Sequence, residues 1–390
     1  MKKKNFFLKA PKSKLFQISK KSSHPDAIYL ALSLLLAVLG SLAVFTAGRA
    51  YAEFRYDDGT YFIKKQIIWL AMGVAVMIAA SRLPVSFYKS VTPFLYVLTI
   101  VLLIMVLAIG FVGNGAQRWI SIGPLTIQPS EICKLVLVLA LAKYFSDNSD
   151  KISDRSNTKK VLVFGTLIPF AIMLLPIILV MLQKHLSCII ILGTIGILVI
   201  FISGINPKFL YIFLLVGILA VAALALFTDY TKERITVWRD PEAYSLTGGW
   251  QTLQGLMAIG SGGLFGVGIG KSVLKHCYVS EPANDMIFAI VCEECGFVGA
   301  VLILLLFAAV CQRGFLIGLR SKDTYSRIVA CGISIKTAVQ VLLNVGVVTN
   351  TIPNTGISLP FFSYGGSSLL MMFLEVGIML SISRDSKIIK

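Results

Sequence analysis

Charged residues are scarce in this chain, and their scarcity excludes an ordinary soluble domain. Only 14% of the 390 residues are charged, whereas a typical globular domain carries about a quarter. Histidine is scarcer still, with only His24, His185 and His276. These three are scattered, and no two have the spacing of a metal site. The sequence shows no arrangement typical of a nucleophilic triad.

The chain also lacks a disulfide framework and a nucleotide-binding loop. Its seven cysteines are an odd number, and six of them lie in or beside apolar runs. The glycine-rich segment 260–272 ends in Gly-Lys-Ser, but Phe265 stands where a Walker A loop needs glycine. Close approach of backbones accounts better for these glycines, although a few N–H groups could still face a phosphate.

Apolar sequence is what the chain has in abundance. Hydrophobic residues make up 56% of it, and the mean hydropathy is +0.83. Runs of roughly 20 apolar residues recur, each long enough to cross a bilayer core of about 30 Å. Since helices satisfy their own backbone groups in lipid, we predict an all-α integral membrane protein with about ten transmembrane helices. The predicted spans lie near 27–48, 62–81, 88–112, 128–146, 161–182, 186–204, 208–228, 285–311, 326–350 and 366–383.

The distribution of positive charge predicts the topology. The net charge is +17, and eight lysines lie in the first 25 residues, before an apolar run without an evident signal-peptide cleavage site. The positive-inside rule explains this basic tail, with contact to anionic lipid as an addition, and no nucleic acid is implied. The predicted organisation is a cytoplasmic tail 1–25, a polytopic domain 26–384 and a cytoplasmic tail 385–390, with outer segments 112–127, 229–284 (the long loop between spans seven and eight) and 351–365.

Asp285 is the foremost candidate for a functional residue, because it lies where the predicted long outer loop meets an apolar helix. One interpretation is structural: an Asp at a helix start accepts backbone N–H bonds and favours the positive end of the helix dipole. The other is catalytic: a carboxylate partly withdrawn from water has a raised pKa and suits a general base. The two roles are compatible.

Glu293 and Glu294 lie two turns further along the same apolar run. A charge at mid-bilayer costs on the order of 2.5–3.5 kcal/mol, so these acids must pair, be protonated or line a wet cavity. Lys134 and Lys336 are possible partners. Both a structural ion pair and a part in the site remain open.

A second polar group opens the fourth predicted span. Ser130 suits a helix N-cap, and Glu131 and Lys134 are neighbours on a helix surface because they are three residues apart. Upstream, Arg118 could grip a pyrophosphate and Trp119 could stack on a sugar, or both could be anchors at the membrane interface.

Five motifs in order give the chain a resemblance to a known family. They are Gly115–Ile120 (GAQRWI), Gln128–Glu131 (QPSE) with Lys134, Ala258–Gly263 (AIGSGG), Glu281-Pro282 with Asn284-Asp285, and Leu359–Ser368 (LPFFSYGGSS). Together with about ten spans and one long outer loop, they resemble the SEDS family (shape, elongation, division and sporulation proteins: RodA, FtsW, SpoVE). The resemblance covers nearly the whole chain except the basic tail. The sequence around Tyr278 and Asp285 looks more like FtsW and SpoVE than RodA.

The resemblance implies an inverting peptidoglycan glycosyltransferase that polymerises lipid II into glycan strands on the outer face of the bacterial cytoplasmic membrane. Its essential acid would be Asp285, which would deprotonate the acceptor sugar 4-hydroxyl as undecaprenyl pyrophosphate leaves. Arg118, Lys134 or a divalent cation (Mg²⁺ or Mn²⁺) could stabilise the pyrophosphate. No protein metal ligands are predicted. The residues expected to shape the substrate site are Arg118, Trp119, Glu131, Lys134, Glu281, Ser363 and Gly365.

The implied partners are lipid II (an undecaprenyl-pyrophosphate-linked disaccharide pentapeptide), a class B penicillin-binding protein, other divisome or elongasome membrane proteins and the bilayer. Cell division and sporulation are the implied processes. Two alternatives stay open: a lipid II flippase, which would also use intramembrane acids, and a scaffold without catalysis. The absence of obvious paired broken helices in the sequence argues against the transporter.

The chain departs from the family pattern in three places. Residues 183–187 lack the acid and proline common there, so we predict no catalytic role for them. Val279-Ser280 replaces the usual Leu-Pro, and Asn354 stands where an apolar residue is common. Because Asp285, Glu131, Lys134 and Arg118 are retained, we expect an active enzyme.

Overall fold

The computed structural model describes residues 24–113, 116–122, 125–153, 162–204, 229–276 and 278–386. Its first half contains α1 (Ala27–Tyr56), α2 (Tyr61–Arg82), α3 (Val85–Ile109), β1 (Phe111–Gly113), β2 (Ala116–Ile122), β3 (Leu125–Ile127), α4 (Pro129–Asp147), α5 (Ser149–Ser153), the π-helical turn η1 (Val163–Leu167), α7 (Ile168–Leu182) and α8 (Leu186–Ile202). The second half contains α10 (Asp229–Arg239), α11 (Trp250–Gly262), α12 (Ile287–Arg320), α13 (Thr324–Val348) and α14 (Gly366–Asp385).

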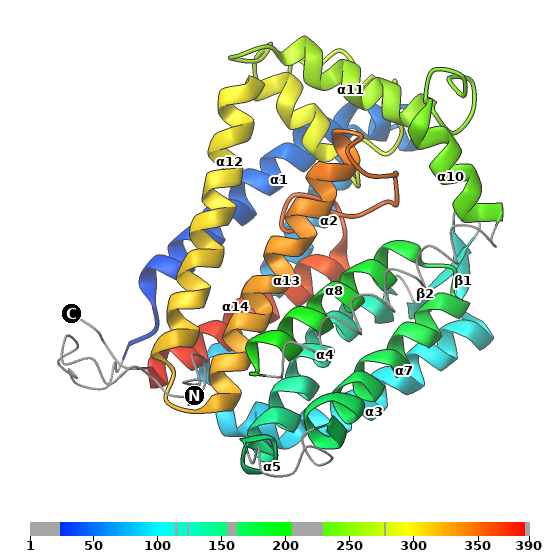
Figure 1. Cartoon of the computed structure of the whole chain (residues 1–390). Helices are drawn as coiled ribbons and strands as arrows, with labels where there is room; N and C mark the ends of the chain where they lie inside the picture. The colour runs from blue at the N-terminus through cyan, green and yellow to red at the C-terminus, as the bar shows by residue number, and fades with distance from the viewer. Residues whose placement is uncertain are drawn as a thin grey trace, which may run out of the picture.

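The helices form one bundle, as the apolar runs predict (Figure 1). Within the described residues, seven helical segments are long and apolar enough to cross a membrane: α1, α2, α3, η1 with α7, α12, α13 and α14. α8 is apolar but shorter, and α4 carries the charges of Glu131 and Lys134. Nine of the ten predicted spans therefore correspond to helices, and the span predicted near 208–228 lies outside the described residues.

The segment between α3 and α4 folds into a small sheet that the sequence did not predict. β1 pairs with β2, and β2 pairs with β3, both antiparallel. Ile120 of β2 lies opposite Ile127 of β3. The sheet positions Arg118 and Trp119, which both belong to β2.

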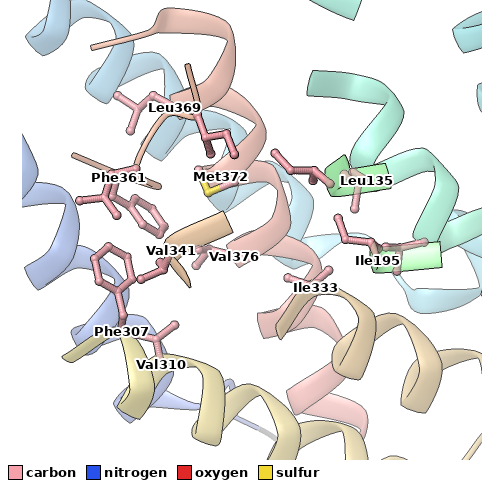
Figure 2. Close-up of a cluster of buried hydrophobic side chains, with 14 of the residues drawn as sticks. Leu135, Ile195, Phe307, Val310, Ile333, Val341, Phe361, Leu369, Met372 and Val376 are labelled. Carbon is pink, nitrogen blue, oxygen red and sulfur yellow. The ribbon is translucent and has the colours of Figure 1, made fainter. Parts of the chain in front are cut away.

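Side chains from widely separated helices meet in the centre of the bundle. Figure 2 shows Leu135 of α4 and Ile195 of α8 beside Ile333 of α13 and Met372 of α14, with Phe307 of α12 also in the cluster. Burial of such side chains holds α13 and α14 in the middle of the molecule, and most residues of both helices are buried.

Polar contacts join α1, α12 and α14 at one end of the bundle, which we call the Asp26 end. Asp26 accepts from the backbone of Tyr29 at 2.9 Å and so caps α1. Its carboxylate also forms an ion pair with Arg313 of α12 at 2.9 Å, and its N–H donates to Ser383 of α14 at 3.0 Å. The start of the first helix and the end of the last therefore lie on the same side, as the even number of predicted spans requires.

α12 is broken at Gly296, where φ is 68° and ψ is −172°. A Cβ at this position would lie 2.3 Å from the backbone nitrogen of Gly266, so only glycine fits. The helix changes direction near the end of α11 (Figure 1). The glycine-rich segment after α11 fills the break, because Val267 and Gly268 donate backbone hydrogen bonds to the carbonyls of Glu293 and Glu294 at 3.0 Å.

Candidate active site

Asp285 lies at the junction of three segments that are distant in sequence. It is the second residue before α12, whose N-cap position is Met286, so its carboxylate is not a conventional helix cap. Asn344 of α13 donates its amide to the Asp285 carbonyl at 3.0 Å and to the Ile357 carbonyl at 2.6 Å. This fully buried side chain joins the loop before α12 to the segment 351–365.

The carboxylate of Asp285 is half-buried and faces an amide. Gln251, in the first turn of α11, donates its Nε2 to both carboxylate oxygens at 3.3 and 3.4 Å. Burial and the nearby charge of Glu281 raise the pKa of Asp285 to about 6, although backbone N–H groups and Gln251 act in the opposite direction. Such a group is ionised at neutral pH and is a stronger base than a free aspartate.

Glu281 and Ser363, two predicted site residues, shape the loop that carries Asp285. Glu281 has a φ of 53° and accepts a hydrogen bond from the side chain of Asn284. The Ser363 hydroxyl donates to the Asn284 carbonyl at 2.7 Å and accepts from the N–H of Leu359 at 2.7 Å. Ser363 therefore holds the 280–286 loop against the segment 351–365.

Gly365 lies two residues beyond Ser363, directly before α14, in an extended conformation. The nearest atom to a Cβ built there is the Ser368 Cβ, at 3.6 Å. Close packing therefore does not explain this glycine.

Glu131 and Lys134 form the pair that their spacing predicts. The Lys134 ammonium lies 2.7 Å from the Glu131 carboxylate, and both side chains are buried. Lys134 also donates to Gln340 of α13 at 3.3 Å, and Gln340 donates to the Ser358 carbonyl at 3.0 Å. A continuous polar path therefore runs from α4 to the segment that borders Asp285.

Arg118 and Trp119 lie on β2. Arg118 donates to the carbonyl of Lys184 at 2.7 Å, and its buried Nε has no hydrogen-bond partner among the described residues. Trp119 is half-buried and opposite Phe111 in the sheet. These two residues are thus near the turn 183–187 between α7 and α8.

The turn 183–187 connects several parts of the site, although its sequence suggested no catalytic role. The hydroxyl of Ser187 donates to the Thr355 carbonyl. His185 lies 3.5 Å from the Ser130 hydroxyl and is buried. Burial and the positive charges of Arg118 and Lys134 lower the pKa of His185 to about 3, so this imidazole is neutral at physiological pH.

The comparison with protein families is decisive. The model of the FtsW/RodA/SpoVE family, described as "Cell cycle protein", matches residues 26–388.

The chain belongs to the FtsW/RodA/SpoVE family.

Individual members of this family are similar over almost their full length. Stage V sporulation protein E of Bacillus subtilis is 37% identical, with 94% of this chain and 99% of that protein aligned. The probable peptidoglycan glycosyltransferase FtsW of Coxiella burnetii is 33% identical over 93% of this chain and 97% of its own length.

Solved structures show the same fold. The rod shape determining protein RodA of Thermus thermophilus superposes with a TM-score of 0.69 and 27% identity, covering 93% of this chain and 97% of RodA. A chain from a peptidoglycan synthase complex, described as coordinating polymerization and crosslinking, gives a TM-score of 0.76 at 27% identity, covering 93% of this chain and 98% of that one. The all-helical, multi-span fold is therefore that of RodA.

The predicted partners of Glu293 and Glu294 were wrong. Lys134 pairs with Glu131, and Lys336 pairs with Glu375 of α14 at 2.7 Å. Glu293 instead accepts from the Ser272 hydroxyl and from the backbone of Val273 at 2.9 Å.

Glu294 forms an ion pair with Lys275 at 3.0 Å. Both acids thus contact residues 272–275 of the segment between α11 and α12, and residues 267–268 of the same segment bond to the backbone beside the break at Gly296.

Four polar residues of the region were missed by sequence reasoning. Gln340, Asn344 and Glu375 lie inside apolar runs, and the cost of polar groups in a membrane would have identified them. Gln251 lies in α11, in a segment without a comparable signal, so only the fold brings it to Asp285.

No cation site is built from carboxylates, cysteines and histidines in the part of the chain that the structure describes. No group of three or more such side chains is placed to hold a metal ion there. Near Asp285, Glu281 is the neighbouring acid. A divalent cation that binds pyrophosphate therefore stays a prediction.

Proposed function

We propose that this protein is a peptidoglycan glycosyltransferase that polymerises lipid II, with Asp285 as its general base. The observation that carries the proposal is the half-buried Asp285 carboxylate, which accepts from the neutral amide of Gln251 and whose pKa is raised to about 6. Similarity to probable peptidoglycan glycosyltransferases supports the reaction class.

In the proposed step, Asp285 accepts the proton of the acceptor 4-hydroxyl. The acceptor oxygen forms a bond to the donor anomeric carbon while the bond from that carbon to the pyrophosphate oxygen breaks. Undecaprenyl pyrophosphate leaves with the bonding electrons as an anion, so it needs no proton from a general acid. One displacement at the anomeric carbon inverts its configuration.

We propose different roles for the two cations that the resemblance placed at the pyrophosphate. Lys134 is only 2% exposed and is already engaged by Glu131 and Gln340, so we assign it to positioning the segment 351–365. Arg118 is partly exposed on β2, and we propose it as the ligand of the pyrophosphate, with Trp119 beside the sugar.

The partner and the topology are part of the same proposal. We propose that the Asp26 end faces the cytoplasm and that α11 and Asp285 face the outer side, because the basic residues Arg313 and Arg384 lie toward the Asp26 end. A class B penicillin-binding protein would cross-link the strands during division or sporulation. The similarity to a chain of a peptidoglycan synthase complex supports this partnership.

A lipid II flippase remains the second candidate, because α12 is a broken helix. However, the carbonyls freed at the break accept hydrogen bonds from Val267 and Gly268. The protein's own backbone thus occupies the place where a transported ion or substrate would bind.

The test is polymerisation of purified lipid II by the reconstituted protein, with and without a class B penicillin-binding protein, beside Asp285→Ala. Glycan strands from the wild type and none from the variant are expected. Strands from a well-folded Asp285→Ala sample would overturn the role of Asp285. Movement of lipid II between leaflets without strands, even with the partner, would favour the flippase.

A further inference from the structure

A chain of amide groups leads from the segment 351–365 to the Asp285 carboxylate. We propose that Asn354 and Gln251 are positioning residues, which hold an amide N–H donor against Asp285 and so keep it a carboxylate ready to accept a proton. This inference rests on the proposed function of Asp285 and adds the residues that control its ionisation.

One backbone N–H group sets the orientation of both side-chain amides in this hydrogen-bonded series. The N–H of Gly356 donates to Oδ1 of Asn354 at 3.1 Å, so the Nδ2 of Asn354 must face the other way. That Nδ2 donates to Oε1 of Gln251 at 3.1 Å. Gln251 therefore presents its own Nε2 to the two oxygens of Asp285, at 3.3 and 3.4 Å.

Contacts from three other elements fix the position of Asn354. Arg234 of α10 donates to the Asn354 carbonyl, and Ser187 donates to the carbonyl of the next residue, Thr355. Two residues further, Asn344 of α13 holds the carbonyl of Ile357. The amide of Asn354 thus starts from an anchored backbone, which makes its orientation a property of the fold.

Few charges face Asp285, so a single amide has a large influence. Glu281 lies in the same loop and raises the pKa of Asp285, and Arg234 lies behind Asn354. The residue that α13 directs at this region is the neutral Asn344, and α11 and the segment 351–365 carry no charged residue.

The chemistry depends on which end of the Gln251 amide meets Asp285. An N–H donor stabilises the carboxylate, whereas an amide oxygen in the same place would stabilise the protonated acid. Without Asn354, the Gln251 amide could rotate and present Oε1. Asn354 replaces an apolar residue common in the family, so this control belongs to a position at which the chain departs from the family pattern.

The experiment compares the pH dependence of polymerisation for the wild type, Asn354→Val, Gln251→Leu and the matched control Thr351→Val. Thr351 lies in the same segment, but its hydroxyl contacts Thr349 and not Asp285. We expect the acid limb of the profile to move upward by about one pH unit in the first two variants, with the rate recovering at high pH, and to stay in place in the control.

Infrared titration of the Asp285 carboxyl, with Asp285→Asn as the blank, gives a readout that is independent of turnover. An upward shift in both variants supports the inference even if no strands form, in which case the proposed function alone fails. Polymerisation with unshifted titrations in both variants would overturn the inference while the function stands. A rate that falls equally at every pH, without a shift, would also overturn it and indicate a merely structural role.

Discussion

Asp285 and Glu375 are two carboxylates withdrawn from water in different regions of the same bundle. Glu375 is fully paired, because Lys336 lies 2.7 Å from it and both side chains are buried. The Asp285 carboxylate accepts from the amide of Gln251 and forms no ion pair with any of the described residues. A buried acid that is neutralised by a lysine fixes helices, whereas one that is held by amides keeps a basic lone pair for chemistry.

Among the changes that test this comparison, replacing Asp285 by asparagine should have the largest effect on turnover. We expect turnover to fall by about 10²–10⁴-fold, because the general base is lost. The unfolding temperature should stay the same or rise, since burial no longer opposes a charge at this position. Lipid II polymerisation and thermal unfolding of the same preparation test both parts, and a large loss of stability would show that Asp285 is structural.

Replacing Lys336 by methionine should have the opposite outcome, a large loss of stability. It leaves Glu375 buried without its partner, and breaking such a pair costs about 3–5 kcal/mol in the free energy of unfolding. The double variant Lys336→Met/Glu375→Leu should recover most of that loss. Denaturation in detergent micelles measures the stability of both variants. If Lys336→Met were as stable as the wild type, the Lys336–Glu375 pair would not be a structural counterpart to Asp285.

Gln340 connects the Glu131–Lys134 pair of α4 to the segment 351–365, since it accepts from Lys134 and donates to the Ser358 carbonyl. Gln340→Leu should cost about 1–3 kcal/mol in stability and lower turnover by up to about 10²-fold, less than the Asp285 change. Thr337→Val is the control, because among the described residues its hydroxyl bonds to the helix carbonyl of Ile333 alone. Equal effects of the two changes on turnover would mean that the path through Gln340 has no special role.

The pH dependence of turnover should show the smallest change. Because burial and Glu281 raise the pKa of Asp285 to about 6, the base is lost below that pH and the rate should fall about tenfold per unit. Glu281→Gln removes a negative charge, which lowers the pKa, so activity should persist to a pH that is lower by about half a unit. An acid limb that moves upward in this variant would contradict the assigned cause.

Apolar runs and local spacing were sufficient to predict the helices and one contact of the candidate site. Every predicted span within the described residues is a helix, because a run of about 20 apolar residues has no other way to satisfy its backbone in lipid. The Glu131–Lys134 pair followed from its three-residue spacing. The sheet β1–β3 was missed, since its strands are short and irregular.

Contacts between distant residues could not be predicted in the same way. Glu293 and Glu294 were assigned the wrong lysines, because their partners Ser272, Val273 and Lys275 come from the segment between α11 and α12. Gln251 is 34 residues from Asp285 and 103 from Asn354, so no local period relates them.

The sequence by itself thus determined that the chain is a helical membrane protein and that Asp285 stands where a long polar segment meets a helix, since both follow from hydropathy and the local order of residues. The tertiary structure alone decided which groups surround that carboxylate. Burial and the amide of Gln251 come from the fold, and they act on the ionisation of Asp285 together with the charge of Glu281 in its own loop.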